Sequence, residues 1–122
     1  MTSKLRRIAD WLQDIREAMN HVEEDIGSMS KEEFLADGKT QRAVIESIIV
    51  IGEASNRVMR LDPAIETAAP ELWMQLREAY QTRNLVTHEY HRVDASVVWD
   101  TVKLDLPAVD GLIAGFLASV RE

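Results

Sequence analysis

An arginine, a histidine and a tyrosine stand close together near the carboxyl end of an amphipathic segment, at Arg83, His88 and Tyr90. If residues 72–90 are helical, Arg83 falls in line with apolar side chains that recur in steps of four and three, the spacing of a buried helical face. A guanidinium is costly to bury unless a partner or a ligand meets it. Arg83 is therefore expected to meet a partner side chain or a ligand. The predicted buried face comprises Leu72, Leu76, Ala79, Arg83, Val86 and Tyr90.

His88 follows Arg83 by five residues, which places the two side chains about 140° apart around an ideal helix. They share a pocket only if the helix frays near His88 or if two subunits complete the site. From the spacing alone a structural role is favoured, in which Arg83 pairs with a core glutamate and His88 caps the helix.

The pattern Arg-x4-His-x-Tyr, with Asn84 directly after the arginine, resembles the signature of the HepT family. This family belongs to the HEPN superfamily of small all-helical ribonucleases. The segment Ile51-Gly52-Glu53-Ala54 is similar to the family's Gly-Glu segment in a middle helix, and Val93-Asp94 before the helix of Trp99 also fits. Glu89 departs from the pattern, because many members carry a small residue between the histidine and the tyrosine. A carboxylate at this place is expected to weaken phosphate binding or to favour the charged form of His88.

The resemblance implies a metal-independent endoribonuclease that cleaves tRNA or mRNA, as a homodimer with its two motifs facing across a cleft. Such cleavage needs a group that takes the 2′-hydroxyl proton, a group that protonates the leaving oxygen, and a cation for the phosphorane charge. Histidine suits either proton transfer, and the arginine fork suits the phosphorane oxygens. Arg83 and His88 are the implied catalytic residues, and Asn84 would hold the substrate or orient His88. The products would carry a 2′,3′-cyclic phosphate.

Tyr90 has a separate implied role. In the HepT family the matching tyrosine accepts a nucleotide from a cognate minimal nucleotidyltransferase, the antitoxin of a type VII-like toxin–antitoxin system. Adenylylation of Tyr90 would require an exposed phenol that the partner's site deprotonates. The added nucleotide would block RNA beside Arg83 and His88 and would bring in phosphate charge. Alternatively, Tyr90 is a packing residue at an interface.

Glu53 has two candidate partners, Arg83 and Arg57, the second of which is one helical turn away. His88 and His91 are spaced as two metal ligands on a helix could be, but no third ligand stands nearby. We expect neither a metal site nor a cofactor.

A binding module is the main rival to the nuclease. In that reading the domain does not cut RNA and recruits substrate for a partner nucleotidyltransferase. A purely structural helical adaptor is a third reading. The motif by itself does not separate these functions.

Composition limits the class of protein. The chain has 122 residues, 46% of them hydrophobic, and no cysteine, which indicates one globular domain over residues 1–122 in a reducing compartment. The sequence shows no signal segment, so a soluble cytoplasmic protein without a membrane partner is expected. The net charge of −7 disfavours a broad nucleic-acid surface, and no DNA partner is expected. Arg77 to Arg92 forms a near-neutral to basic island in this acidic chain.

Apolar residues recur at helical spacing in four long segments, near residues 5–26, 40–61, 70–90 and 94–120. Short helical pieces are expected after Ser30 and within 63–69, and Pro107 should bend or split the last helix. These segments predict an all-α, up-and-down bundle of four long helices with short extra helices. Glycines at which a neighbouring helix could come close are Gly52, Gly111 and Gly115.

Overall fold

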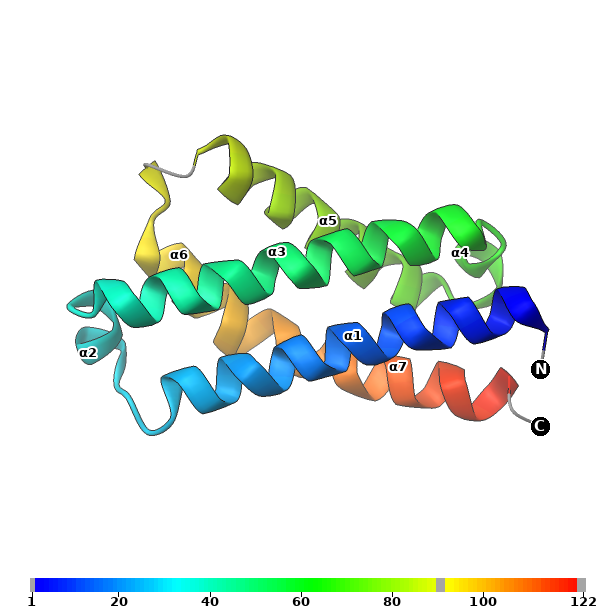
Figure 1. Ribbon diagram of the computed structural model, residues 1–122, viewed down its shortest axis with the longest axis horizontal. Helices are drawn as coiled ribbons and strands as arrows, with labels where there is room; N and C mark the ends of the chain where they lie inside the picture. The colour runs from blue at the N-terminus through cyan, green and yellow to red at the C-terminus, as the bar shows by residue number, and fades with distance from the viewer. Residues whose placement is uncertain (1, 90–91, 121–122) are drawn as a thin grey trace.

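Four long helices form the body of the protein and run alternately in opposite directions (Figure 1). The computed structural model describes residues 2–89 and 92–120. The long helices are α1 (Ser3–Ile26), α3 (Gly38–Leu61), α5 (Pro70–His88) and α7 (Leu106–Val120). The shorter elements are α2 (Lys31–Leu35), α4 (Ile65–Ala68), α6 (Ala95–Asp100) and the π-helical segment η2 (Thr101–Asp105). No strand occurs in the described ranges, which confirms the predicted all-α bundle.

The ends of the helices follow local signals in the sequence. Gly27, with a φ of 54°, ends α1 in a conformation that glycine adopts readily. Ser30 and Glu33 form a reciprocal capping box at the start of α2. The carboxylate of Asp94 accepts a hydrogen bond of 2.8 Å from the backbone N–H of Ser96 and caps α6. The chain therefore enters and leaves its helices where residues 27, 30 and 94 predict.

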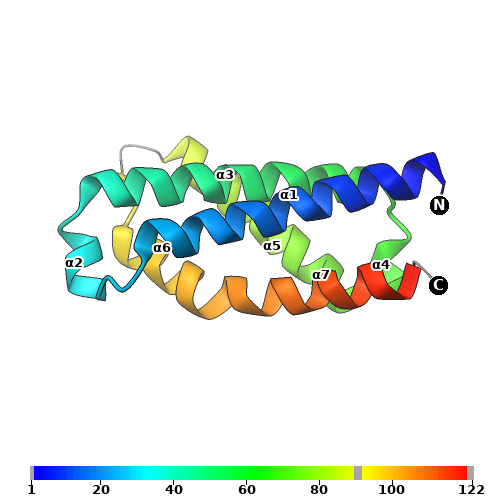
Figure 2. The same ribbon diagram turned by 60° about the horizontal axis from the view of Figure 1, so that its bottom comes forward.

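Helix α3 is the centre of the bundle, because α1 packs on one side of it and α5 on another (Figures 1 and 2). Its buried residues include Val44, Ile45, Ser47, Ile48, Ile51, Ala54, Ser55 and Val58. The hydroxyl of the fully buried Ser55 donates to the backbone oxygen of Ile51, at 2.7 Å, so this polar group is satisfied inside the core.

Helix α5 crosses α3 at close range over Gly52. A Cβ atom at Gly52 would overlap the Cβ of Arg83 and would lie 2.8 Å from the backbone oxygen of Ala79. Gly52 therefore lets the backbone of α5, and with it Arg83, sit directly on α3, as predicted. A Cβ at Gly111 or Gly115 would meet no atom within 4 Å, so the close approach predicted there is wrong within this chain.

Pro107 is the second residue of α7, and α6, η2 and α7 follow one another without a break, so the last helical segment is not split at this proline. The turn before it is widened, because the N–H of Leu106 bonds to the oxygen of Thr101, five residues back. Proline has no N–H for a regular helical bond at this point, and the π-helical turn accommodates the mismatch. Within the described residues, no helix is both long and apolar enough to cross a lipid bilayer.

Candidate functional site

Arg83 lies on α5 where this helix touches α3, and its side chain is 30% exposed. Its Nη2 lies 3.5 Å from Oε2 of Glu53, and its Nη1 donates to Oδ1 of Asn84 at 2.9 Å. Its Nε is buried and has no hydrogen-bond partner among the described residues. Both terminal nitrogens of the guanidinium therefore have partners, and the third nitrogen is buried, while the side chain as a whole is partly exposed.

Glu53 forms an ion pair with each of its two predicted partners, Arg83 and Arg57. Its second oxygen, Oε1, lies 3.4 Å from Nε of Arg57, one turn further along α3. The guanidinium of Arg57 in turn lies 5.8 Å from the ring centroid of Trp11 on α1. A chain of contacts thus runs from Trp11 through Arg57 and Glu53 to Arg83, and it joins α1, α3 and α5.

His88 is the last residue of α5 and is exposed. The helix does not fray before it, because the N–H of Glu89 still bonds to the oxygen of Leu85 at 2.9 Å. The spacing of Arg83 and His88 allowed a shared pocket if the helix frayed near His88 or if two subunits completed the site. The first of these conditions is therefore not met.

Arg83 and His88 are related through Asn84. The guanidinium of Arg83 turns toward Asn84. Asn84 and His88 are four residues apart on a regular helix, and residues at this spacing share one face. The structure thus brings Arg83 into contact with both Glu53 and Asn84, and His88 follows Asn84 by one helical turn. Asn84 accepts its hydrogen bond from Arg83 in this structure, and its predicted roles toward the substrate or His88 stay predictions.

Tyr90 and His91 lie outside the described residues, so the modification site and the histidine pair have no structural account here. In the part of the chain that the structure describes, no group of three His, Cys, Asp or Glu side chains is placed to hold a metal ion.

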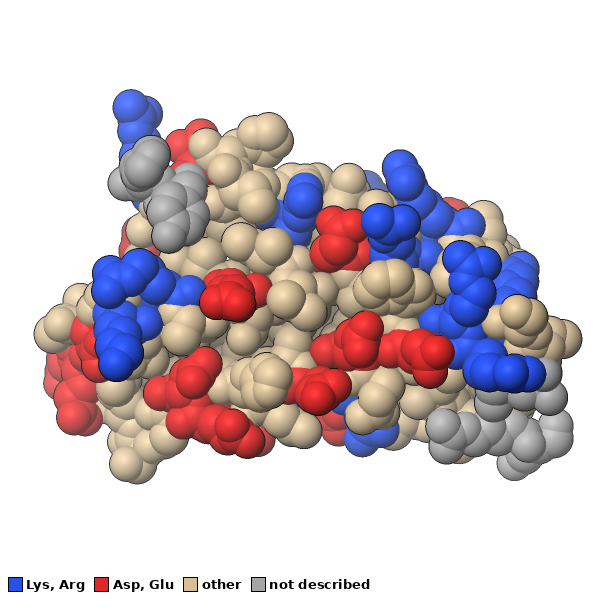
Figure 3. All heavy atoms as spheres, viewed as in Figure 1, with Lys and Arg blue, Asp and Glu red and all other residues tan. Residues whose placement is uncertain are grey.

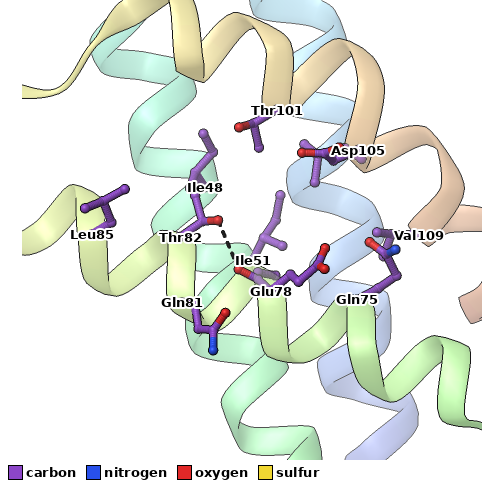
Figure 4. Close-up of a pocket in the computed structure, with 12 residues that line it drawn as sticks. Ile48, Ile51, Gln75, Glu78, Gln81, Thr82, Leu85, Thr101, Asp105 and Val109 are labelled. Carbon is purple, nitrogen blue, oxygen red and sulfur yellow. Dashed lines mark hydrogen bonds between the residues drawn. The ribbon is translucent and has the colours of Figure 1, made fainter.

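A second feature lies on the opposite flank of α5, where two adjoining pockets separate this helix from α6, η2 and α7. Figure 4 shows the first of them, between α3, α5, η2 and α7. They have volumes of about 290 and 200 Å³, and we call them together the apolar groove. Ile48 of α3 forms part of the floor of both pockets. At the rim, Leu85 is 57% exposed and Val97 is 54% exposed. Residues shared by the two pockets are Ile48, Thr82, Leu85 and Thr101.

Sequence reasoning did not predict the apolar groove or the contact between Arg57 and Trp11. Leu85 stands outside the predicted buried face of α5, and a large apolar residue at such a position is the signal that was present. Trp11 and Arg57 come from helices far apart in the chain, and only the packing of α1 on α3 makes them neighbours.

Comparison with known proteins identifies the family. Residues 15–114 match the family model "Ribonuclease HepT-like". A protein of Thermococcus cleftensis named "Probable ribonuclease HepT" is 41% identical over 106 residues, which cover 84% of this chain and 88% of that protein. A protein of Methanocaldococcus jannaschii named "Putative RNase MJ0127" is 34% identical over 98 residues, which cover 80% of this chain and 76% of that protein. No solved structure gives a significant match. The chain belongs to the HepT-like ribonuclease family.

Proposed function

We propose that this protein is a metal-independent endoribonuclease and the toxin of a toxin–antitoxin pair, with tRNA or mRNA as its substrate. The observation that carries the proposal is the state of Arg83. Its guanidinium is half-buried, braced by Glu53 and Asn84, and retains a buried Nε without a partner in the described chain. A cation prepared in this way suits a phosphate whose negative charge grows during the reaction.

In the proposed reaction the 2′-hydroxyl oxygen of a ribose attacks the adjacent phosphorus atom. One imidazole takes the proton of that hydroxyl, and another donates a proton to the departing 5′-oxygen. The bond from phosphorus to the 5′-oxygen breaks, which leaves a 2′,3′-cyclic phosphate on one product and a 5′-hydroxyl on the other. Arg83 stabilises the extra charge on the phosphorane oxygens.

A homodimer would supply the second imidazole, because only His88 stands on the same face of α5 as Asn84 among the described histidines. The exposed apolar side chains at the rim of the apolar groove support a protein contact on that side of α5. Leu85 precedes His88 by three residues on a regular helix, so a second copy seated on Leu85 and Val97 would approach His88.

The antitoxin in this proposal is a minimal nucleotidyltransferase that adenylylates Tyr90. The phenol oxygen would attack the α-phosphorus of ATP and release pyrophosphate. Support comes from the sequence position, since Tyr90 follows the exposed residues His88 and Glu89. An AMP group at this place would fill the space that RNA needs beside Arg83 and add negative charge to it. Intact mass spectrometry of the co-expressed pair would detect one AMP per chain, and a Tyr90→Phe variant should carry none.

The experiment for nuclease activity uses the purified chain without its antitoxin, RNA oligonucleotides and EDTA. Wild-type protein should produce fragments that end in a 2′,3′-cyclic phosphate. The variants His88→Ala and Arg83→Ala should lose cleavage and toxicity in cells while they melt near the wild-type temperature. If both variants unfold instead, the two residues are structural and the proposed mechanism is wrong.

A binding module that recruits substrate for a partner nucleotidyltransferase is the second candidate. The observation in its favour is that Arg83 already has an anion, Glu53, at 3.5 Å, and Glu89 places another carboxylate directly after His88. Both carboxylates oppose the binding of phosphate at this site. RNA that stays intact at every protein concentration, together with specific capture of RNA by the dimer, would favour the module.

A further inference from the structure

Positive charge lies at both ends of this acidic chain, and one of the two groups adjoins the helices that carry Glu53 and Arg83. Figure 3 shows Lys and Arg side chains clustered over the start of α1 and the end of α3. Helical spacing explains the cluster, because Lys4 and Arg7 are three apart on α1, while Arg57 and Arg60 are three apart on α3. Arg77 of α5 lies seven residues before Asn84 and so on the same face of that helix. We call these five exposed residues the basic face: Lys4, Arg7, Arg57, Arg60 and Arg77.

The basic face is continuous with the candidate active site. Arg57 belongs to the face and shares the carboxylate of Glu53 with Arg83. From Glu53 to Arg60 is seven residues of regular α3, or about 10 Å along the helix axis. At the rise of roughly 3.4 Å per nucleotide in a stacked strand, that length accommodates about three nucleotides.

The face ends abruptly on α1. Beyond Arg7 the exposed charges are Asp10, Asp14 and Glu17. Partial burial, together with repulsion from Glu17 and Asp10, raises the pKa of Asp14. A polyanion would be repelled from this part of α1, so it can follow only the edge along α3 and α5. The change from positive to negative charge along α1 therefore leaves one path for a polyanion, from the end of the bundle toward Arg83.

The residue types favour phosphate over a carboxylate-bearing partner. Four of the five cations are arginines, whose planar fork matches the oxygens of a phosphodiester in two-point contacts. One of these forks, that of Arg57, lies over the ring of Trp11 at 5.8 Å from its centroid. Of the five, Lys4 pairs with Asp62 at 3.6 Å and Arg57 with Glu53, so both are partly neutralised.

We propose that the basic face binds the phosphate backbone of the RNA strand that flanks the cleaved phosphate and leads this strand to Arg83. The inference rests on the proposed ribonuclease function and adds to it a binding surface built from α1, α3 and α5. It predicts that a long substrate gains contacts on this face that a dinucleotide cannot reach.

The test measures the anisotropy of a labelled single-stranded RNA bound to His88→Ala protein, in which the RNA stays intact. A triple variant changes Arg7, Arg60 and Arg77 to Gln and leaves Arg57 and Lys4 in their ion pairs. The matched control changes Lys39, Arg42 and Lys103 to Gln, which removes the same charge at the other end of α3 and from η2. Circular dichroism checks that both variants fold.

The triple variant should weaken RNA binding at least about tenfold at low salt, and the slope of log K against log salt should fall by about 2, roughly 0.7 for each lost phosphate contact. The control should retain its affinity within about twofold, because its cations lie away from the proposed strand path. Equal losses in both variants would mean that only net charge matters, and no loss in either would mean that RNA binds elsewhere. Either result overturns the inference.

Two further measurements separate this inference from the nuclease proposal. In the otherwise wild-type protein, the triple substitution should slow cleavage of a long oligonucleotide and leave cleavage of a dinucleotide unchanged. If no RNA of any length is cleaved, the nuclease proposal fails, and the binding assay still decides the role of the basic face. If the triple variant keeps its RNA affinity but loses a purified nucleotidyltransferase partner, the face binds an acidic protein and the inference is wrong.

Discussion

The two flanks of α5 differ sharply in character. On one flank Arg83 contacts Glu53 of α3 and Asn84 of its own helix, and the exposed Arg77 lies on the same face of α5 as Asn84, so the surface is polar and carries positive charge. On the other flank the apolar groove runs along Thr82 and Leu85, and large apolar side chains remain exposed at its rim. The buried residues of α5 are only Leu72, Leu76 and Val86, whereas α3 buries residues along most of its length.

This difference indicates a division of labour within one helix. The narrow buried face of α5 is sufficient to dock it on α3, and both flanks are left free for other contacts. The polar flank is suited to an anion, because the guanidinium of Arg83 is held by Glu53 and Asn84. The groove flank is suited to another protein surface, because exposed apolar area of this kind is stabilised by burial. If the comparison is right, substitutions on the polar flank will reduce cleavage without changing the oligomeric state, whereas substitutions on the groove flank will change both.

The largest expected effect is on the polar flank. His88→Ala should reduce RNA cleavage by about 10²–10⁴-fold, the usual contribution of a positioned acid–base group. Its melting temperature and its oligomeric state should stay near those of the wild type, because His88 is exposed at the end of α5. Single-turnover cleavage kinetics and light scattering measure the two properties. A variant that still cleaves at the wild-type rate would remove His88 from the mechanism.

On the groove flank the first effect should be loss of the dimer, and loss of cleavage should follow from it. Leu85→Asp together with Val97→Asp puts charge on two exposed apolar positions and should convert a dimer into a monomer, as measured by light scattering. Cleavage should then fall at least about tenfold, because the second imidazole is lost. Met74→Asp is the control, since Met74 is 58% exposed on the same helix, far from His88. A dimer that survives the double substitution would show that the second copy docks elsewhere.

Much of this arrangement was predictable from local sequence, and the rest depends on packing between distant segments. The capping residues and the periodic apolar faces predicted the helices, because both act within a few residues of the chain. The same argument about glycine was right at Gly52 and wrong at Gly111 and Gly115, since a glycine permits a close approach without specifying a neighbour. Sequence also left the partner of Glu53 open between Arg57 and Arg83, and the structure gives it both.

The basic face was even harder to predict from the sequence, because it depends entirely on packing between distant segments. Net charge is a sum over the chain, and a value of −7 argued against a nucleic-acid surface. Helices α1, α3 and α5 each contribute only one or two cations, which no local pattern marks as a group. Their antiparallel packing assembles the face, so the tertiary fold had to be known before the charges could be placed.

A smaller effect is expected where α5 crosses α3. Gly52→Ala should lower the free energy of unfolding by about 1–3 kcal/mol, because the new methyl group meets the backbone of Ala79 and the Cβ of Arg83. Gly115→Ala is the matched control and should be neutral or stabilising by up to about 1 kcal/mol, since its methyl group meets nothing and alanine favours the helix. Urea denaturation measures both. Equal changes in the two variants would contradict the close crossing that holds Arg83 on α3.

The smallest effect on stability, and the sharpest test of the polar flank, comes from Glu53→Gln. Glu53 is 39% exposed, so its ion pairs should contribute less than about 1 kcal/mol to stability. Its carboxylate competes with phosphate for Arg83 and also holds that guanidinium in place. Removal of the charge should therefore tighten RNA binding in the His88→Ala background and lower kcat in the otherwise wild-type enzyme. Glu46→Gln, an exposed carboxylate two turns earlier on α3, controls for the change in net charge. If both variants change affinity and kcat alike, Glu53 acts only through the net charge of the protein, and its contact with Arg83 does not matter for activity.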